Sequence, residues 1–258
     1  MNPWLGSVLA MTAAGLVGCA ATAASSGATA WPGIHLLTVR AGKTTLPYAL
    51  YVPRGYTSRR SWPLIVFLHG SGECGSDGIR QLTQGLPQAI LAAPERWPVL
   101  ALFPQKPSAD TEWEAWEEHV LAMLATTRHQ LRVDPRRLVL TGLSQGGHGA
   151  WVLGARHADL WSAIVPVCGY LAVRQAAPGP TLDRATIARA LAGVPVWAFH
   201  GQDDPVVPVR ETEAMVAALR EAGAEPRTTI YPDVGHGAWV PAYQEASLAR
   251  WLLARRSR

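Results

Sequence analysis

Residues 138–151 read LVLTGLSQGGHGAW, an apolar run that meets a Gly-x-Ser-x-Gly turn. The run predicts a strand, and the Ala- and Leu-rich residues after the turn predict a helix. A strand that turns so sharply into a helix leaves room only for small residues beside the central one. Gly142 and Gly146 provide that room, so Ser144 is left exposed on a strained corner, as a nucleophile must be. Because short motifs match often, a Gly-rich turn with an incidental serine fits the pentapeptide too.

Two alternating runs near the start, and a series of uninterrupted apolar runs after them, predict strands. They lie at residues 36–40, 45–52, 63–68, 99–103, 137–140, 163–167, 194–199 and 227–231. Helical patterns alternate with them at residues 79–92, 112–131, 147–156, 183–190, 210–221 and 243–254. Uninterrupted apolar strands are typical of a parallel sheet with both faces covered. The alternation predicts an α/β fold with a mostly parallel sheet, helices on both faces and no large cap domain.

The composition fits one globular domain over residues 31–258. Hydrophobic residues make up 48% of the 258 residues and charged residues 16%, which suits a well-buried core. The sequence shows no internal repeat, linker or change of composition after Ala30. The net charge of +4 is mildly basic, and no Lys/Arg cluster precedes Arg255-Arg256-Ser257-Arg258. We therefore expect no nucleic-acid partner.

Residues 1–30 contain no Asp, Glu, Lys or Arg, and residues 5–16 are apolar, which predicts an export signal. The segment is too rich in small and polar residues for a membrane span. Leu16-Val17-Gly18-Cys19 resembles a bacterial lipobox, which implies that Cys19 is lipidated and tethers the chain to a membrane. We expect an exported bacterial protein, either a cell-envelope lipoprotein or a secreted or periplasmic protein. An unprocessed N-terminus is the remaining alternative.

Two further cysteines lie in the predicted domain. Cys74 and Cys168 both follow predicted strands and could meet at one edge of the sheet. In an oxidising compartment they could form a disulfide. Two free thiols fit the sequence equally well.

The predicted strand at residues 63–68 runs into His69-Gly70-Ser71-Gly72-Glu73-Cys74-Gly75. The glycines fit a dinucleotide fingerprint, but no helix opens within the motif and no acidic residue ends the next strand. An oxyanion loop is the better interpretation, because acyl transfer needs two backbone N–H groups aimed at the developing negative charge. We expect these from Gln145, directly after Ser144, and from Ser71, with His69 as a support of the loop.

A carboxylate at a strand end can orient a histidine ring and stabilise its charged form. His200-Gly201-Gln202-Asp203-Asp204-Pro205 follows a predicted strand, and either aspartate could serve. We favour Asp204, because the residue before a proline is biased to an extended conformation. His236 lies between two glycines after the last predicted strand, downstream of both the serine and the acid. The order Ser144, Asp204, His236 is that of α/β-hydrolases.

Four blocks of the sequence resemble the α/β-hydrolase superfamily, and within it the small esterases of the phospholipase/carboxylesterase and dienelactone-hydrolase type. The chain is also similar to secreted esterases and "predicted peptidases" with a His-Gly-x-Gly-Glu loop. The resemblance covers about residues 36–253 and implies a triad of Ser144, Asp204 and His236. The blocks are His69-Gly70-Ser71-Gly72-Glu73, Gly142-Leu143-Ser144-Gln145-Gly146-Gly147, His200-Gly201-Gln202-Asp203-Asp204-Pro205-Val206-Val207-Pro208 and Gly235-His236-Gly237-Ala238-Trp239.

The sequence therefore predicts a serine carboxylic-ester hydrolase that forms an acyl-enzyme, acting on a small-molecule or polymer-linked ester. A serine peptidase of the prolyl-oligopeptidase type and a non-catalytic binding protein on the same fold are the alternatives. We expect neither cofactor nor metal, because the sequence has no His-Glu-x-x-His motif and no phosphate-binding Gly-x-x-x-x-Gly-Lys-Ser/Thr motif. Trp113, Trp116 and Trp239 are candidates for lining the site, and residues 169–182 for a modest lid.

Overall fold

The computed structural model describes residues 31–171 and 182–257. The predicted export signal with Cys19, and residues 172–181 of the predicted lid, lie outside the described residues. None of the described helices is long and apolar enough to cross a bilayer.

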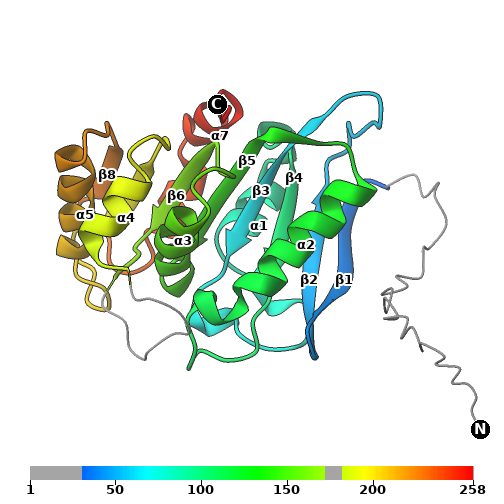
Figure 1. Cartoon of the computed structure of the whole chain (residues 1–258), viewed down its shortest axis with the longest axis horizontal. Coiled ribbons are helices and arrows are strands. Elements are labelled where there is room, and N and C mark those ends of the chain that lie inside the picture. Colours follow the sequence, from blue (N-terminus) through cyan, green and yellow to red (C-terminus); the bar gives the residue numbers. More distant parts are fainter. Residues whose placement is uncertain (1–30, 172–181, 258) are drawn as a thin grey trace, which may run out of the picture.

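An eight-stranded sheet in the order β1-β2-β4-β3-β5-β6-β7-β8 forms the centre of the fold (Figure 1). β1 and β2 form an antiparallel hairpin, β2 is antiparallel to β4, and the remaining neighbours are parallel. The predicted mostly parallel sheet is confirmed. The strands are β1 (Gly33–Ala41), β2 (Thr44–Val52), β3 (Trp62–Leu68), β4 (Leu100–Pro104), β5 (Val133–Leu143), β6 (Ala163–Val167), β7 (Trp197–Gly201) and β8 (Arg227–Tyr231).

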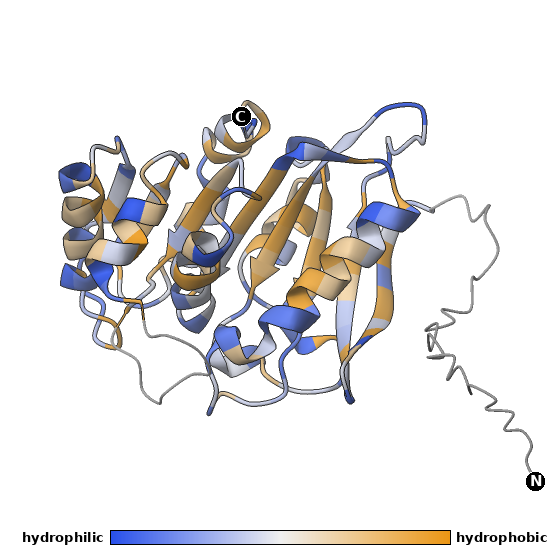
Figure 2. Ribbon diagram, viewed as in Figure 1, coloured by the Kyte–Doolittle hydropathy of each residue, from blue (hydrophilic) through white to orange (hydrophobic). Residues whose placement is uncertain are grey.

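Helices cover both faces of the sheet, as predicted. They are α1 (Leu86–Ala92), α2 (Glu117–Gln130), α3 (Gln145–Arg156), α4 (Arg184–Ala190), α5 (Arg210–Glu221), α6 (Trp239–Gln244) and α7 (Leu248–Leu253). Helices α2 to α5 pack on one face, and α1, α6 and α7 on the other, each over its own cluster of buried apolar residues (Figure 1). Figure 2 shows the apolar strands enclosed between helices whose outer sides are hydrophilic. No cap domain interrupts the sheet within the described residues.

Several helices differ from their predicted extents; the predicted helix at residues 112–131, for example, is a 3-10 turn at Trp113–Trp116 followed by α2. Local chemistry explains two of the differences. The predicted helix at residues 79–92 is a 3-10 turn at Arg80–Leu82 followed by α1. Gly85 has a φ of 71°, and Pro87 lies in the first turn of α1, where its missing N–H costs least. The predicted helix at residues 243–254 is divided into α6 and α7, because Glu245 leaves the helical conformation and its carboxylate accepts from the Ser247 N–H at 3.1 Å.

Candidate active site

The Gly-x-Ser-x-Gly turn forms the sharp corner that the sequence predicts. Ser144 has φ 52° and ψ −116°, which is strained for a residue with a side chain. A Cβ atom on Gly142 would lie 2.2 Å from the Gly146 carbonyl oxygen, and one on Gly146 would lie 1.9 Å from that of Leu68. The Ser144 N–H donates to Val167 O at 2.9 Å, which fastens the corner to β6. The glycines thus allow β3, β5 and α3 to approach closely enough to present the serine hydroxyl.

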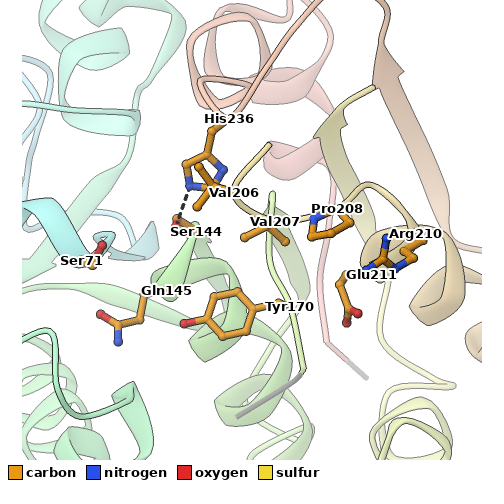
Figure 3. Close-up of a pocket in the computed structure, with 10 residues that line it drawn as sticks. All are labelled: Ser71, Ser144, Gln145, Tyr170, Val206, Val207, Pro208, Arg210, Glu211 and His236. Atoms are coloured by element: carbon orange, nitrogen blue, oxygen red, sulfur yellow. Dashed lines mark hydrogen bonds between the residues drawn. The ribbon is translucent and has the colours of Figure 1, made fainter. Parts of the chain in front are cut away.

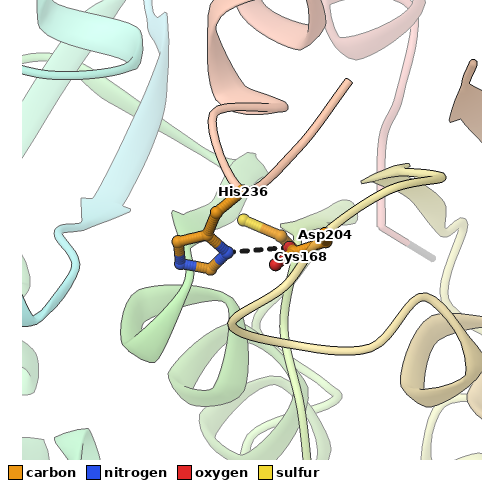
Figure 4. Close-up of side chains that lie close together, drawn as sticks. All are labelled: Cys168, Asp204 and His236. Carbon is orange, nitrogen blue, oxygen red and sulfur yellow. Dashed lines mark hydrogen bonds and ion pairs between the residues drawn. The ribbon is translucent and has the colours of Figure 1, made fainter. Parts of the chain in front are cut away.

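Three side chains from the loops that follow β5, β7 and β8 meet at this corner; Figure 3 shows Ser144 with His236, and Figure 4 shows His236 with Asp204. His236 Nε2 lies 2.9 Å from Ser144 Oγ, and His236 Nδ1 lies 2.7 Å from Asp204 Oδ2. With the Nδ1 proton donated to the carboxylate, Nε2 has a lone pair free to accept the serine proton. The carboxyl ends of parallel strands share one edge of the sheet, which is why residues so far apart in sequence converge.

The structure brings Asp204, and not Asp203, to the histidine. Asp204 is 8% exposed, and its Oδ1 accepts the N–H groups of Val206 and Val207 at 2.8 and 2.9 Å. Its Oδ2 is left for His236 and lies 3.2 Å from His200 Nε2. Asp203 is exposed. The carboxylate of Asp204 is therefore fixed in one orientation by donors on both oxygens.

The loop after β3, which we call the oxyanion loop after its predicted role, is held by hydrogen bonds to its own side chains and to the residue after Gln105. The Gly70 N–H is bonded to Glu73 Oε2 at 2.9 Å, so it is not available to a substrate. His69 Nδ1 donates to Gly70 O at 2.6 Å, and His69 Nε2 accepts from the Lys106 N–H at 3.2 Å. In a trans peptide the C=O and the following N–H point in opposite directions, so this bond turns the Ser71 N–H away from the His69 ring. Burial lowers the pKa of His69 to about 4, which keeps the ring neutral as these two bonds require.

Gln145 is the first residue of α3, so its N–H has no acceptor within its own helix. The positive end of the helix dipole also lies there. Gln145 and Ser71 both line the cavity beside Ser144 (Figure 3).

Gln105 holds the far side of the oxyanion loop. Its Nε2 donates to Glu73 O at 3.2 Å and to Asp77 Oδ1 at 2.9 Å, and its Oε1 accepts from the Gly78 N–H at 2.7 Å. Gln105 is fully buried, directly after β4. The Gln105 side chain therefore ties the loop, which contains a 3-10 turn at Ser71–Glu73, to the end of β4.

A cavity of about 370 Å³ opens at the serine (Figure 3). Four of the residues that line it are predicted site residues, and Tyr170 lies in the predicted lid segment; the other five follow the acid closely in sequence and were not predicted as site residues. The lining residues are Ser71, Ser144, Gln145, Tyr170, Val206, Val207, Pro208, Arg210, Glu211 and His236. Val206, Val207 and Pro208 line one part of the cavity with apolar atoms, and Arg210 and Glu211 line another part with charged groups.

The three candidate tryptophans are not among the residues that line this cavity. The expectation is wrong for Trp113, which is 1% exposed and donates from Nε1 to His69 O at 3.1 Å, beneath the oxyanion loop. Trp116 packs on the core and donates to Thr111 Oγ1 at 2.9 Å. Trp239 packs its ring edge-to-face against His236, with ring centres 5.3 Å apart. Two of these rings thus support active-site loops from behind.

A buried ion pair lies behind the cavity wall. His148 Nε2 lies 2.9 Å from Glu114 Oε1, and His148 Nδ1 donates to Tyr170 O at 2.9 Å. Burial alone would lower the pKa of His148, but its bond to the Glu114 carboxylate raises the pKa overall. The His148 ring also stacks on Tyr170, with ring centres 5.0 Å apart. The pair therefore fixes the position of a residue that lines the cavity.

Cys168, Asp204 and His236 could offer ligand atoms to a metal ion, since one such atom of each lies within 4.8 Å of the others (Figure 4). Burial strongly raises the pKa of the Cys168 thiol, whereas metals bind the thiolate. Asp204 and His236 are already bonded to each other. The group fits a triad packed on a neutral thiol. Both Cys74 and Cys168 are free thiols in the structure.

Comparison with known proteins places this geometry in a family. The chain is 25% identical over 210 residues to an uncharacterised secreted protein of Arthroderma benhamiae, covering 67% of this chain and 21% of that protein. It is 29% identical over 106 residues to an acyl-protein thioesterase of Gibberella zeae, covering 41% of this chain and 43% of that protein. The chain thus spans less than half the length of these curated relatives.

Among solved structures, a thermostable esterase superposes with a TM-score of 0.70 and 28% identity, covering 86% of this chain and 63% of the esterase. This likeness confirms the predicted α/β-hydrolase fold. The sequence pattern of the dienelactone hydrolase family matches residues 105–249, more than half of the chain. The chain belongs to the dienelactone hydrolase family, a family of hydrolases.

Proposed function

We propose that the chain is a serine carboxylic-ester hydrolase that works through an acyl-enzyme intermediate. The observation that carries the proposal is the unbroken line of hydrogen bonds from Asp204 through His236 to Ser144, with distances of 2.7 and 2.9 Å. A serine hydroxyl is a weak nucleophile until a base takes its proton, and this arrangement supplies the base and its orienting acid.

In the first step, His236 takes the Ser144 proton as the hydroxyl oxygen attacks the ester carbonyl. The negative charge that develops on the carbonyl oxygen is stabilised by the N–H groups of Ser71 and Gln145. Loss of one such donor costs on the order of 3 kcal/mol in transition-state stability. The His236 imidazolium, stabilised by Asp204, then protonates the departing alcohol. Water, activated by His236, releases the acyl group and regenerates Ser144.

The cavity supports a soluble ester or an ester group on a polymer as the substrate. It is bounded on one side by the apolar Val206, Val207 and Pro208, while Arg210 and Glu211 provide a polar end. Its volume of about 370 Å³ suits a small acyl or aryl group. A serine peptidase on the same triad is the competing activity, because the same nucleophile attacks amides.

Two comparisons test the proposal. Replacing Ser144 by Ala should abolish hydrolysis of nitrophenyl acetate and leave the circular dichroism spectrum unchanged. The wild-type enzyme should hydrolyse acyl nitrophenyl esters far faster than peptide anilides, and a wider ester panel should include acetylated and feruloylated sugars. Undiminished ester hydrolysis by Ser144→Ala would refute the nucleophile, and faster cleavage of the anilides would assign a peptidase.

We also propose that the protein is exported and tethered through a lipidated Cys19. The support is the sequence of residues 1–30, which lacks charged side chains and contains the lipobox-like Leu16-Val17-Gly18-Cys19. Labelling of cells with a radioactive fatty acid should mark the wild-type protein and not Cys19→Ala. Equal labelling of both would contradict the assignment.

A further inference from the structure

Arginines that are scattered along the sequence gather at one end of the fold. Three segments form this end, which we call the arginine face: residues 53–61 between β2 and β3, residues 128–137 leading into β5, and residues 255–257 after α7. They hold three, four and two arginines, nine in all, against one acidic residue, Asp134. Since the whole chain carries +4, a face of +8 leaves −4 on the remainder. The molecule is therefore electrically polarised.

Contacts between the three segments show that they form one surface. The Arg132 N–H donates to the Tyr56 hydroxyl at 3.0 Å, which joins the first segment to the second. Arg136 Nε donates to Ser257 O at 3.1 Å, and Arg256 pairs with Asp134 at 3.0 Å, which joins the second to the third. The exposed arginines of this face include Arg54, Arg59, Arg60, Arg132, Arg136 and Arg256.

The arginine face and Ser144 lie at opposite ends of the sheet. β5 begins within the face, at Val133, and ends at Leu143, next to the serine (Figure 1). Eleven residues of strand span roughly 35 Å at about 3.3 Å per residue. The loops at the cavity end carry exposed acidic side chains, among them Asp203 after β7 and Asp233 after β8, while Arg210 and Glu211 both line the cavity itself. A negatively charged surface would attract the first end and repel the second.

The chain also enters the fold at the arginine face. β1 begins at Gly33, which pairs with Val52, the last residue of β2 before the arginine-rich loop. Trp31 precedes it and is 75% exposed. Tryptophan is enriched where proteins meet the headgroup region of a bilayer. The described part of the chain therefore begins at the end of the fold on which the arginines lie.

We propose that the arginine face docks on a bilayer that contains anionic lipid, with the Ser144 cavity directed away from the membrane. Clustered basic side chains are attracted to such a surface within about a Debye length. A nucleic acid would also attract arginines, but the entry of the chain and the exposed Trp31 at the same face favour a membrane. The orientation places soluble or polymer-linked esters, and not the bilayer lipids, within reach of the serine. The docking itself does not depend on the proposed hydrolase activity.

Co-sedimentation of the full chain with phosphatidylcholine vesicles, with and without phosphatidylglycerol, tests the proposal. The test variant is Arg54→Gln/Arg59→Gln/Arg132→Gln, which removes three exposed charges from the face. The matched control is Arg40→Gln/Arg189→Gln/Arg220→Gln, which removes three exposed charges elsewhere. Ser144→Ala is included as a catalytically inactive protein of wild-type charge.

We expect tighter binding to vesicles with phosphatidylglycerol, and loss of that difference at about 0.5 M NaCl. The test variant should bind them on the order of 100-fold more weakly than wild type, while the control variant and Ser144→Ala bind as wild type does. Equal weakening of the test and control variants would contradict docking through this face. Binding that does not depend on phosphatidylglycerol would assign the attachment to the leader alone. Equally tight binding to duplex DNA at the same salt concentration would replace the membrane by a general polyanion.

Discussion

Gly201, the last residue of β7, lies so close to the loop that carries His236 that a Cβ atom on it would be 2.2 Å from the carbonyl oxygen of Val234. Two backbone hydrogen bonds join the loops after β7 and β8 at this point, from Gln202 N to Tyr231 O at 2.9 Å and from Asp203 N to Val234 O at 3.0 Å. The acid and the base are thus brought together by main-chain contact before their side chains meet.

Replacing Gly201 by Ala should push the two loops apart. The loop that carries the Val234 carbonyl cannot move away from the new Cβ atom without breaking the two backbone hydrogen bonds that join the loops. We expect kcat/KM for a nitrophenyl ester to fall by about 100-fold or more, since a misplacement of about 1 Å in a catalytic group has that effect. Gly193→Ala is the matched control, because its Cβ would meet nothing within 4 Å. Similar kcat/KM values for both variants would show that the contact at Gly201 does not position His236.

The two adjacent aspartates should differ sharply. Asp204→Asn removes the charge that orients His236 and stabilises its protonated form, so kcat should fall by about 10⁴-fold. Asp203 is exposed, so Asp203→Asn should have kcat close to the wild-type value. Steady-state kinetics on a soluble ester checks both, and a large loss with Asp203→Asn would mean that the acid has been misassigned.

The triad positions and most strands could be predicted because they depend on local patterns. Ser144 and Asp204 follow apolar strands, His236 follows the weaker strand signal at residues 227–231, and each lies in a loop with glycine or proline. β5 is longer than the predicted strand at residues 137–140. Its first residues were not predicted because they contain Pro135 and lie mostly outside the paired part of the sheet, where a single bridge joins Trp62 to Val133. A proline is tolerated there, but it hides the strand from a periodicity argument.

Features that depend on packing between distant segments could not be predicted. The nine arginines of the arginine face are spread over three segments, so the sequence shows a basic cluster only at its end. The depth of Trp113 beneath the oxyanion loop, and the pairing of His148 with Glu114, depend on how α3 packs beside the 3-10 turn at Trp113–Trp116. Neither the burial of Trp113 nor the His148–Glu114 pair is indicated by a motif in the sequence.

The buried His69 should make stability depend on pH. Its pKa is about 4 in the folded protein, against 6.5 for an unperturbed histidine. Between these two pH values the unfolded chain binds a proton that the native His69 ring does not. The free energy of unfolding therefore has its highest value above pH 6.5 and falls as the pH drops towards 4. The loss is up to about 3 kcal/mol. Urea unfolding of wild type and His69→Gln at several pH values measures it, with the exposed His129→Gln as control. An identical pH slope for wild type and His69→Gln would contradict this account.

Truncation of the buried ion pair behind the cavity should be costly. Glu114→Ala leaves the His148 ring without its carboxylate in a site where the two side chains are 4% and 1% exposed. Breaking such a pair by removing one partner typically destabilises a protein by about 3–5 kcal/mol. Glu118→Ala, at an exposed position of α2, should change stability by less than about 0.5 kcal/mol. Urea unfolding at neutral pH compares them, and equal effects would show that the pair contributes nothing specific.

Labelling with a fluorophosphonate shows whether Ser144 is an activated nucleophile. Such a probe forms a covalent bond only with a serine whose proton has a base to accept it. Mass spectrometry of the intact protein should show one adduct, which peptide mapping places on Ser144. Ser144→Ala should show none, and His236→Ala should react far more slowly. An adduct on another residue, or equally fast labelling of Ser144→Ala, would contradict the account.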